Sequence, residues 1–182
     1  MRHTAGHVVV ATGADPIVPP IPGLAGLEGV WTNREVTAMT AVPRRLPILG
    51  AGPVGVEMAQ AVRRLGGEVV LVDGADRVLN REPVPLRAAL GDVLRRDGIE
   101  LLLGARATRA RRDGDDFVLE LADAPELRGD RLLVATGRQP RVNDIGLETV
   151  GVTPDGGGAP STPTCERANG CGRSATSRTS GR

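Results

Sequence analysis

Apolar runs alternate with helix-like segments along the middle of the chain. Residues 46–49 are mostly apolar, residues 56–65 have the spacing of a helix, and residues 68–72 form a second apolar run that ends at Asp73. This order is typical of a strand, a crossover helix and a parallel strand. The pattern therefore predicts an α/β fold whose central part is a Rossmann-like, three-layer domain.

Segments on both sides extend this prediction. Asp113-Gly114 is a strong turn signal and predicts an antiparallel β-hairpin excursion from the parallel sheet. Thr32 and Glu35 have the spacing of a capping box and predict a short helix. The other predicted segments are strands at 7–12, 99–103 and 131–136, hairpin strands at 105–112 and 115–121, and a proline-rich connector at 17–29.

An amphipathic helix is predicted at residues 85–97, before Gly98, with Leu86 and Leu94 on its apolar face. The strand at 99–103 is continuously apolar after its second residue, so we expect it to be buried and parallel. Pro47 is an irregularity in the first strand. Proline cannot donate a hydrogen bond to a neighbouring strand, so it fits poorly in a central strand.

The turn between the first strand and its helix has the pattern Gly-x-Gly-x-x-Gly. Gly50 permits the tight turn, Gly52 lets backbone N–H groups approach a pyrophosphate, and Gly55 lets the helix pack closely on the strand. Asp73 follows 18 residues after Gly55, where a carboxylate can accept hydrogen bonds from ribose hydroxyls. An ordinary strand–helix turn without a ligand is the alternative. Asp73 favours NAD over NADP because it would repel a 2′-phosphate, whereas Arg77 leaves NADP open.

Composition argues against several classes of partner. The 182 residues carry a formal net charge of +1, which gives no indication of binding to nucleic acid or to an anionic membrane surface. No apolar run approaches the roughly 20 residues that span a bilayer, and the first residues lack the order of a signal peptide. We therefore expect a soluble, cytoplasmic protein.

No metal site is expected from the histidines and cysteines. His3 and His7 have no acidic or cysteine neighbours and are interpreted as ordinary residues near the start of the chain. Cys165 and Cys171 lie in a tail rich in glycine, serine, threonine and arginine. A redox pair or half of a metal site is conceivable there, but incidental thiols are favoured because no ligand-rich motif accompanies them.

Two segments of the chain repeat each other and carry a family resemblance. Residues 8–16 and 132–140 share an apolar run, Ala-Thr-Gly and a proline three residues later, and Gly13 and Gly137 let the chain pass close to another backbone or a cofactor. Pro-Pro-Ile-Pro-Gly-Leu follows at 19–24, and the glycine motif at 50–57. From residue 7 to about 152, the chain resembles the pyridine nucleotide–disulfide oxidoreductase flavoproteins, in particular the dihydrolipoamide dehydrogenase and mercuric reductase group.

The resemblance implies a domain organisation and a set of roles. Residues 1–39 would be a remnant of an FAD-binding domain with its linker, 40–142 an NAD(P)-binding domain, 143–157 the return to the FAD domain, and 158–182 a disordered tail. In such enzymes NAD(P)H gives a hydride to the flavin. The implied cofactor-binding residues are Gly50, Gly52 and Gly55 at the pyrophosphate, Glu57 at the helix start, Asp73 at the adenosine ribose, Gly137 near the nicotinamide and Gly13 in the FAD domain.

The sequence also departs from the family pattern. A second Gly-x-Gly-x-x-Gly near the start, a Cys-x4-Cys pair and the C-terminal dimerisation domain are all missing from the sequence. The FAD pocket and the interface of the family homodimer are therefore expected to be incomplete, and no catalytic residue is assigned. Three interpretations follow: an oxidoreductase fragment that is inactive alone, a standalone NAD-binding module, and a non-functional gene remnant.

The tail from residue 158 does not resemble a fold. When it is back-translated with GC-rich codons and translated two bases later, it can spell a peptide that ends in Trp-Ala-Ile-Gly-Asp-Val. Ile-Gly-Asp resembles the second FAD motif of the family. We therefore hypothesise a frameshift near residues 156–158.

Overall fold

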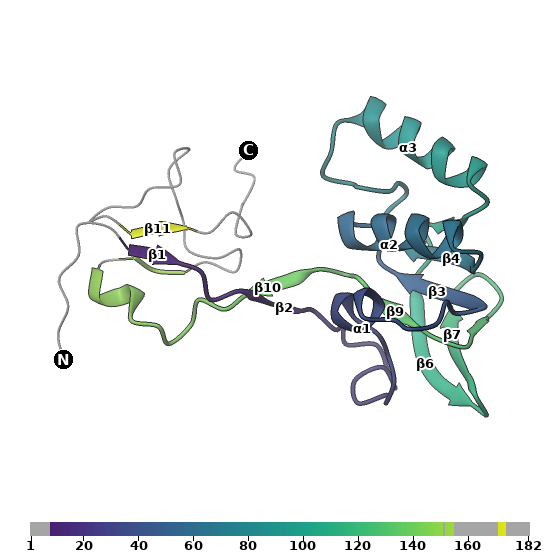
Figure 1. The fold of residues 1–182 in the computed structure, drawn as a ribbon, viewed down its shortest axis with the longest axis horizontal. Helices are drawn as coiled ribbons and strands as arrows, with labels where there is room; N and C mark the ends of the chain where they lie inside the picture. Colours follow the sequence, from purple (N-terminus) through teal and green to yellow (C-terminus); the bar gives the residue numbers. More distant parts are fainter. Residues whose placement is uncertain (1–7, 151, 155–170, 174–182) are drawn as a thin grey trace. The chain divides into compact units, whose positions relative to one another are not determined.

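A computed structural model describes residues 8–150, 152–154 and 171–173 of the chain (Figure 1). Contacts divide it into two compact units. The central unit comprises Pro16–Gly137, and the terminal unit comprises Met1–Asp15 with Arg138–Arg182. His3, His7 and Cys165, together with most of the predicted disordered tail, lie outside the described residues.

A parallel sheet of four strands forms the middle of the central unit. Its order is β5-β4-β3-β9, with β3 at Arg45–Leu49, β4 at Glu68–Asp73, β5 at Glu100–Leu103 and β9 at Leu133–Val134. Helix α2 (Pro53–Arg64) connects β3 to β4, and α3 (Val84–Arg96) leads to β5. The predicted α/β fold is confirmed. Helix α2 begins at Pro53 rather than Val56, because proline is well suited to the first helical position.

Side chains of the sheet alternate between two hydrophobic clusters, one on each face. Leu46, Ile48 and Leu71 pack with apolar residues of α2 and α3, whereas Leu49 and Val72 pack on the opposite face. That opposite face is covered by an antiparallel sheet with the order β6-β7-β8 (Figure 1), formed by β6 (Ala107–Asp113), β7 (Asp116–Leu121) and β8 (Leu127–Gly129). The predicted three-layer architecture is therefore present.

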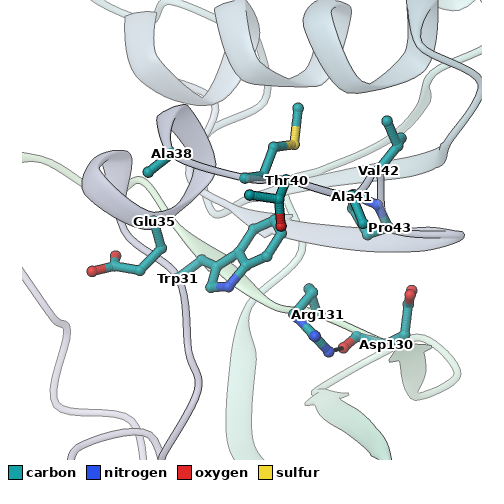
Figure 2. Close-up of a pocket in the computed structure, with 10 residues that line it drawn as sticks. Trp31, Glu35, Ala38, Thr40, Ala41, Val42, Pro43, Asp130 and Arg131 are labelled. Atoms are coloured by element: carbon teal, nitrogen blue, oxygen red, sulfur yellow. Dashed lines mark hydrogen bonds between the residues drawn. The ribbon is translucent and has the colours of Figure 1, made fainter.

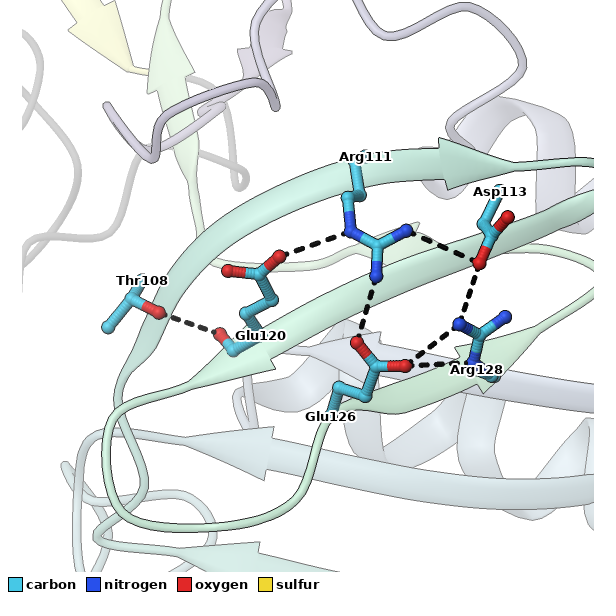
Figure 3. A network of polar contacts seen from close by, with 6 residues as sticks. All are labelled: Thr108, Arg111, Asp113, Glu120, Glu126 and Arg128. Atoms are coloured by element: carbon cyan, nitrogen blue, oxygen red, sulfur yellow. Dashed lines mark hydrogen bonds and ion pairs between the residues drawn. The ribbon is translucent and has the colours of Figure 1, made fainter.

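The predicted hairpin is confirmed as β6 and β7, with Gly114 at φ +59 in the turn. Strand β8 was not predicted. A network of ion pairs ties the three strands together on the face away from the core (Figure 3): Arg111 Nε lies 3.1 Å from Glu120 Oε1, and Arg128 Nη2 lies 2.7 Å from Asp113 Oδ2. The guanidinium of Arg128, followed by that of Arg111, holds the pKa of the Asp113 carboxyl below its usual range.

Strand β3 tolerates Pro47 because of the direction in which its nitrogen faces. Gly50 N–H donates to Val72 O of β4, and Leu49 O accepts from Ala135 on the β9 side. Since backbone groups alternate between the two neighbours, the nitrogen of Pro47 faces the β9 side. Pairing with β9 covers only Ile48 and Leu49, so proline removes no ladder bond.

Two expectations of burial were wrong. Strand β5 is an edge strand among the described strands, so its leucines are half-buried and Glu100 is exposed. In α3, Leu94 is buried as predicted, but Leu86 is 52% exposed because the first turn of this helix extends past the core cluster. Both errors have the same origin: periodicity shows which residues share a face, but not whether another layer covers it.

The beginning of the central unit contains the predicted short helix, α1 (Asn33–Thr37). The capping box is confirmed: Thr32 Oγ1 accepts from Arg34 N–H, and Thr32 N–H donates to Glu35 Oε2 at 2.6 Å. The Thr32 hydroxyl also donates to Glu35 Oε2 at 2.7 Å, and this bond, followed by the one from Thr32 N–H, lowers the pKa of the Glu35 carboxyl.

Apart from Pro16, the residues of two short two-stranded sheets belong to the terminal unit. Strand β1 (Val8–Val10) pairs in parallel with β11 (Cys171–Arg173), and β2 (Ala14–Pro16) pairs with β10 (Arg138–Pro140). A 3-10 turn, η1, spans Leu147–Val150. Across the described parts of both units, no helix combines the length and apolar character needed to cross a bilayer.

Candidate nucleotide-binding site

Gly50 begins the turn at the carboxyl end of β3. Its φ is +113, and an added Cβ would lie 2.5 Å from Ala135 O and 2.9 Å from Thr136 N. Only glycine adopts this conformation without strain, and only glycine leaves room for the backbone after β9. The glycine turn and the second Ala-Thr-Gly segment therefore lie side by side, at the carboxyl ends of β3 and β9.

Gly55 is required by packing within the turn. A Cβ at this position would lie 1.9 Å from Gly50 O, closer than any real contact, and the clash would involve the main chain rather than a flexible side chain. The first turn of α2 therefore lies directly against the backbone of the glycine turn. Gly50 and Gly55 both act by shaping the turn.

Gly52 differs from these two residues because the space around it is open. A Cβ on Gly52 would meet no atom within 4 Å, and its φ of −75 is accessible to any L-amino acid. Gly52 is the N-cap of α2, and no side chain caps the helix there. The first N–H groups of a helix have no intrahelical acceptor and lie at the positive end of its dipole. The open space beside Gly52 therefore leaves the start of α2 accessible to an anionic group.

Asp73 ends strand β4 and reaches the same turn. Its Oδ2 accepts from Ala51 N–H at 2.6 Å, and its Oδ1 accepts from Ala75 N–H at 2.8 Å. A carboxylate oxygen has two lone pairs, so each oxygen keeps one for a further donor such as a ribose hydroxyl. The side chain is half-buried and held in place by both bonds. The structure thus brings Asp73 beside the Gly50–Gly55 turn.

The remaining predicted residues lie in less distinctive surroundings. Glu57 is exposed on α2. Gly137, at φ +147, accepts Ile17 N–H through its carbonyl at 3.0 Å within the central unit. Gly13, at φ +80, lies in the terminal unit, where its carbonyl accepts Arg141 N–H at 3.0 Å.

Two residues near the turn were missed by sequence reasoning. Ala51 contributes no side-chain chemistry, yet its N–H and its carbonyl are both bonded to the segment around the end of β4. Leu79, at φ +48, donates its N–H to Ala51 O at 2.9 Å. No sequence signal marks Ala51, because it acts only through its backbone groups. No signal marks Leu79 either, because leucine rarely adopts a positive φ.

A separate hollow of about 400 Å³ lies beside α1 and is floored by Trp31 (Figure 2). Its charged side chains already make hydrogen bonds or a cation–π contact within the protein. Glu35 accepts from Thr32, Asp130 accepts Arg45 N–H at 2.8 Å, and the guanidinium of Arg131 lies 5.6 Å from the centre of the Trp31 ring. We therefore place the candidate site at the glycine turn. Within the described ranges, no group of three or more His, Cys, Asp or Glu residues is arranged to hold a metal ion.

Comparison with protein families gives one match over most of the chain. The model of the pyridine nucleotide-disulphide oxidoreductases matches residues 2–165. A mercuric reductase from Shewanella putrefaciens is 39% identical over 149 residues, and a dihydrolipoyl dehydrogenase from Thermus scotoductus is 34% identical over 157 residues. The matched segments cover 82% and 83% of this chain but only 26% and 34% of those two proteins.

Solved structures agree with this result. The flavoprotein disulfide reductase RclA from Escherichia coli superimposes with a TM-score of 0.79 at 27% identity, covering 93% of this chain and 39% of RclA. LpdA from Mycobacterium tuberculosis superimposes with a TM-score of 0.78 at 29% identity, covering 94% of this chain and 38% of LpdA. The chain therefore spans between a quarter and two-fifths of the length of these relatives.

Proposed function

Because the chain belongs to the pyridine nucleotide-disulphide oxidoreductase family, we propose that residues 40–142 bind a nicotinamide dinucleotide as the NAD(P)-binding part of an FAD-dependent oxidoreductase. Two features of the same turn carry the proposal: the open space at Gly52, and the Asp73 carboxylate that is bonded to the turn through Ala51 N–H. The first feature accommodates a pyrophosphate and the second a ribose, which are neighbouring groups of one ligand.

Each residue has a distinct task in this proposal. The N–H groups at the start of α2 bind the pyrophosphate beside Gly52, while Gly50 and Gly55 keep side chains out of the turn. Asp73 accepts hydrogen bonds from the adenosine ribose, and Glu57 lies near the start of the same helix. The Ala-Thr-Gly segment ending at Gly137 lies on the nicotinamide side. When bound, the reduced dinucleotide supplies the hydride that this family transfers to a flavin.

We propose NAD rather than NADP as the ligand. A 2′-phosphate would be placed next to the Asp73 carboxylate, which repels it. Arg77 is the nearest cation in the sequence after Asp73, but its Nε lies 3.9 Å from Asp76 Oδ2. That carboxylate offsets part of the attraction that Arg77 would offer to a phosphate.

FAD enters this proposal through the family alone. The described part of the terminal unit, which contains Gly13, has short strands and a 3-10 turn but no α-helix that could present its N-terminus to a second pyrophosphate. We therefore propose that the 182-residue chain does not reduce a flavin by itself. A standalone NAD-binding module is the second candidate, favoured by the complete glycine turn.

The test is a titration of the purified chain. Trp31 is the only tryptophan and the chain has no tyrosine, so quenching of its fluorescence by NADH reports binding with little background. We expect NADH to bind, NADPH to bind more weakly, and the protein to lack the yellow absorbance of a flavin. A chain that does not bind NADH in fluorescence or calorimetry would refute dinucleotide binding. A yellow protein that NADH reduces would refute the proposed inactivity.

A further inference from the structure

The segment after β4 returns to the glycine turn and is bonded to it. We call residues 74–82 the return loop. Ala75 N–H donates to Asp73 Oδ1, Ala75 O accepts Gly104 N–H at 2.8 Å, and Leu79 N–H donates to Ala51 O at 2.9 Å. Val78 is 1% exposed and Leu79 packs against the same hydrophobic cluster. The return loop is therefore fastened to the core on one side and to the glycine turn on the other.

Leu79 has an unusual backbone conformation for its residue type. Its φ is +48, a region that favours glycine and, among other residues, asparagine and aspartate. Such strain persists only where the surroundings over-determine the conformation, and it is frequent at ligand-binding sites. Here the conformation directs Leu79 N–H toward Ala51 O while the side chain remains packed.

The hydrogen bond from Leu79 determines the orientation of a peptide group in the glycine turn. Ala51 C=O and Gly52 N–H belong to one planar peptide, and no cis peptide is present among the described residues. In a trans peptide these two groups point in opposite directions. Since Ala51 C=O points toward Leu79, Gly52 N–H must point away from the return loop. On its other side, Ala51 N–H is held by Asp73 Oδ2 at 2.6 Å.

We propose that Leu79 is a positioning residue for dinucleotide binding. Its N–H keeps the Ala51–Gly52 peptide from flipping, so that Gly52 N–H remains a donor for an anionic group. The inference rests on the proposed function, because the anionic group is the pyrophosphate of the dinucleotide. If the peptide flipped, Ala51 O would be presented to the pyrophosphate, and an oxygen lone pair repels a phosphate oxygen.

Two substitutions separate this backbone role from simple packing. Leu79→Val keeps an apolar side chain, but a β-branched residue strongly disfavours positive φ. Leu79→Asn accepts positive φ but loses the apolar contacts. We expect Leu79→Val to weaken NADH binding about tenfold or more, the effect of one hydrogen bond to a charged group, and Leu79→Asn to weaken it less than about threefold. Urea unfolding, run in parallel, establishes that both variants are folded under the binding conditions.

Equal or greater loss of binding in Leu79→Asn would overturn the inference, since packing would then explain the effect. Amide hydrogen exchange of the ligand-free chain provides a readout that does not depend on NADH. Leu79 N–H is expected to be protected in the wild type and in Leu79→Asn and to exchange rapidly in Leu79→Val, while Gly52 N–H exchanges rapidly in all three. Rapid exchange of Leu79 or protection of Gly52 in the wild type would overturn the inference. Absence of NADH binding with the expected exchange pattern would refute the proposed function instead.

Discussion

Gly52 and Gly55 lie three residues apart in one turn, yet the structure predicts opposite consequences when each is replaced by alanine. In Gly55→Ala the new methyl group would lie 1.9 Å from Gly50 O, and only movement of the main chain can relieve the overlap. Overpacking of this kind costs about 1–3 kcal/mol. The better helix propensity of alanine returns about 0.5–1 kcal/mol. Because the overlap is with the main chain, we expect the cost to lie in the upper half of this range, about 2–3 kcal/mol, so that after the gain of about 1 kcal/mol the free energy of unfolding falls by about 1–2 kcal/mol.

In Gly52→Ala the methyl group meets no protein atom within 4 Å, and φ is already −75. Alanine is a poorer N-cap than glycine, but its lower entropy in the unfolded chain offsets this by about 0.4–1 kcal/mol. Stability should therefore change by less than about 1 kcal/mol. The methyl group would occupy the space proposed for the pyrophosphate, so NADH binding should weaken about tenfold or more.

The assay combines thermal unfolding with NADH titration of the wild type and both variants. A loss of 1–2 kcal/mol lowers the melting temperature of a chain of this size by about 2–8 °C, which defines the result expected for Gly55→Ala. Gly52→Ala should melt close to the wild type and bind NADH about tenfold or more weakly in the titration. The reasoning is refuted if Gly52→Ala binds NADH like the wild type, or if Gly55→Ala melts at an unchanged temperature.

Three further predictions concern the ribose site, the ion pairs and the gene. Asp73→Asn should weaken NADH binding about tenfold and raise the affinity for NADPH relative to NADH, because the charge that repels a 2′-phosphate is removed; an unchanged ratio in calorimetry contradicts this role. Because Arg128 and Arg111 lower the pKa of Asp113 in the folded state, its contribution to stability is present above about pH 4 and is lost as the pH falls further. The melting temperatures of the wild type and Asp113→Asn should therefore differ at pH 7 and converge toward pH 3, and a difference that persists at low pH speaks against the pair. The nucleotide sequence after codon 156 should encode Ile-Gly-Asp in another frame, and the frameshift hypothesis fails if no frame contains it.

Local signals predicted most of the secondary structure because they depend on neighbours in the sequence. The Asp113-Gly114 turn and the capping box at Thr32 are short-range arrangements, and both are present. Strand β8 was missed because three residues, Leu127–Gly129, are too few to show a period. Exposure of β5 and of the start of α3 was missed because burial depends on layers that are distant in the sequence.

The candidate site was predictable in part for the same reason. The glycine motif predicted a tight turn at Gly50, access for a pyrophosphate at Gly52 and close packing of the helix at Gly55, but the sequence could not show the space around each of them. The structure distinguishes Gly52, which faces open space, from Gly55, which leaves no room for a methyl group. The bond from Leu79 to Ala51 had no sequence signal, because it joins two backbone groups across a loop closure.

By itself, the sequence determined the order of the strands and helices of the central unit apart from β8, together with the glycine turn and the acid that ends β4, since periodicity and turn chemistry act over a few residues. Tertiary structure alone decided that Pro47 removes no ladder hydrogen bond, that Asp73 is bonded to Ala51, and that Leu79 orients the peptide before Gly52. Each of these depends on which neighbour a backbone group faces. That is a matter of strand order and register, and it arises only when distant segments pack together.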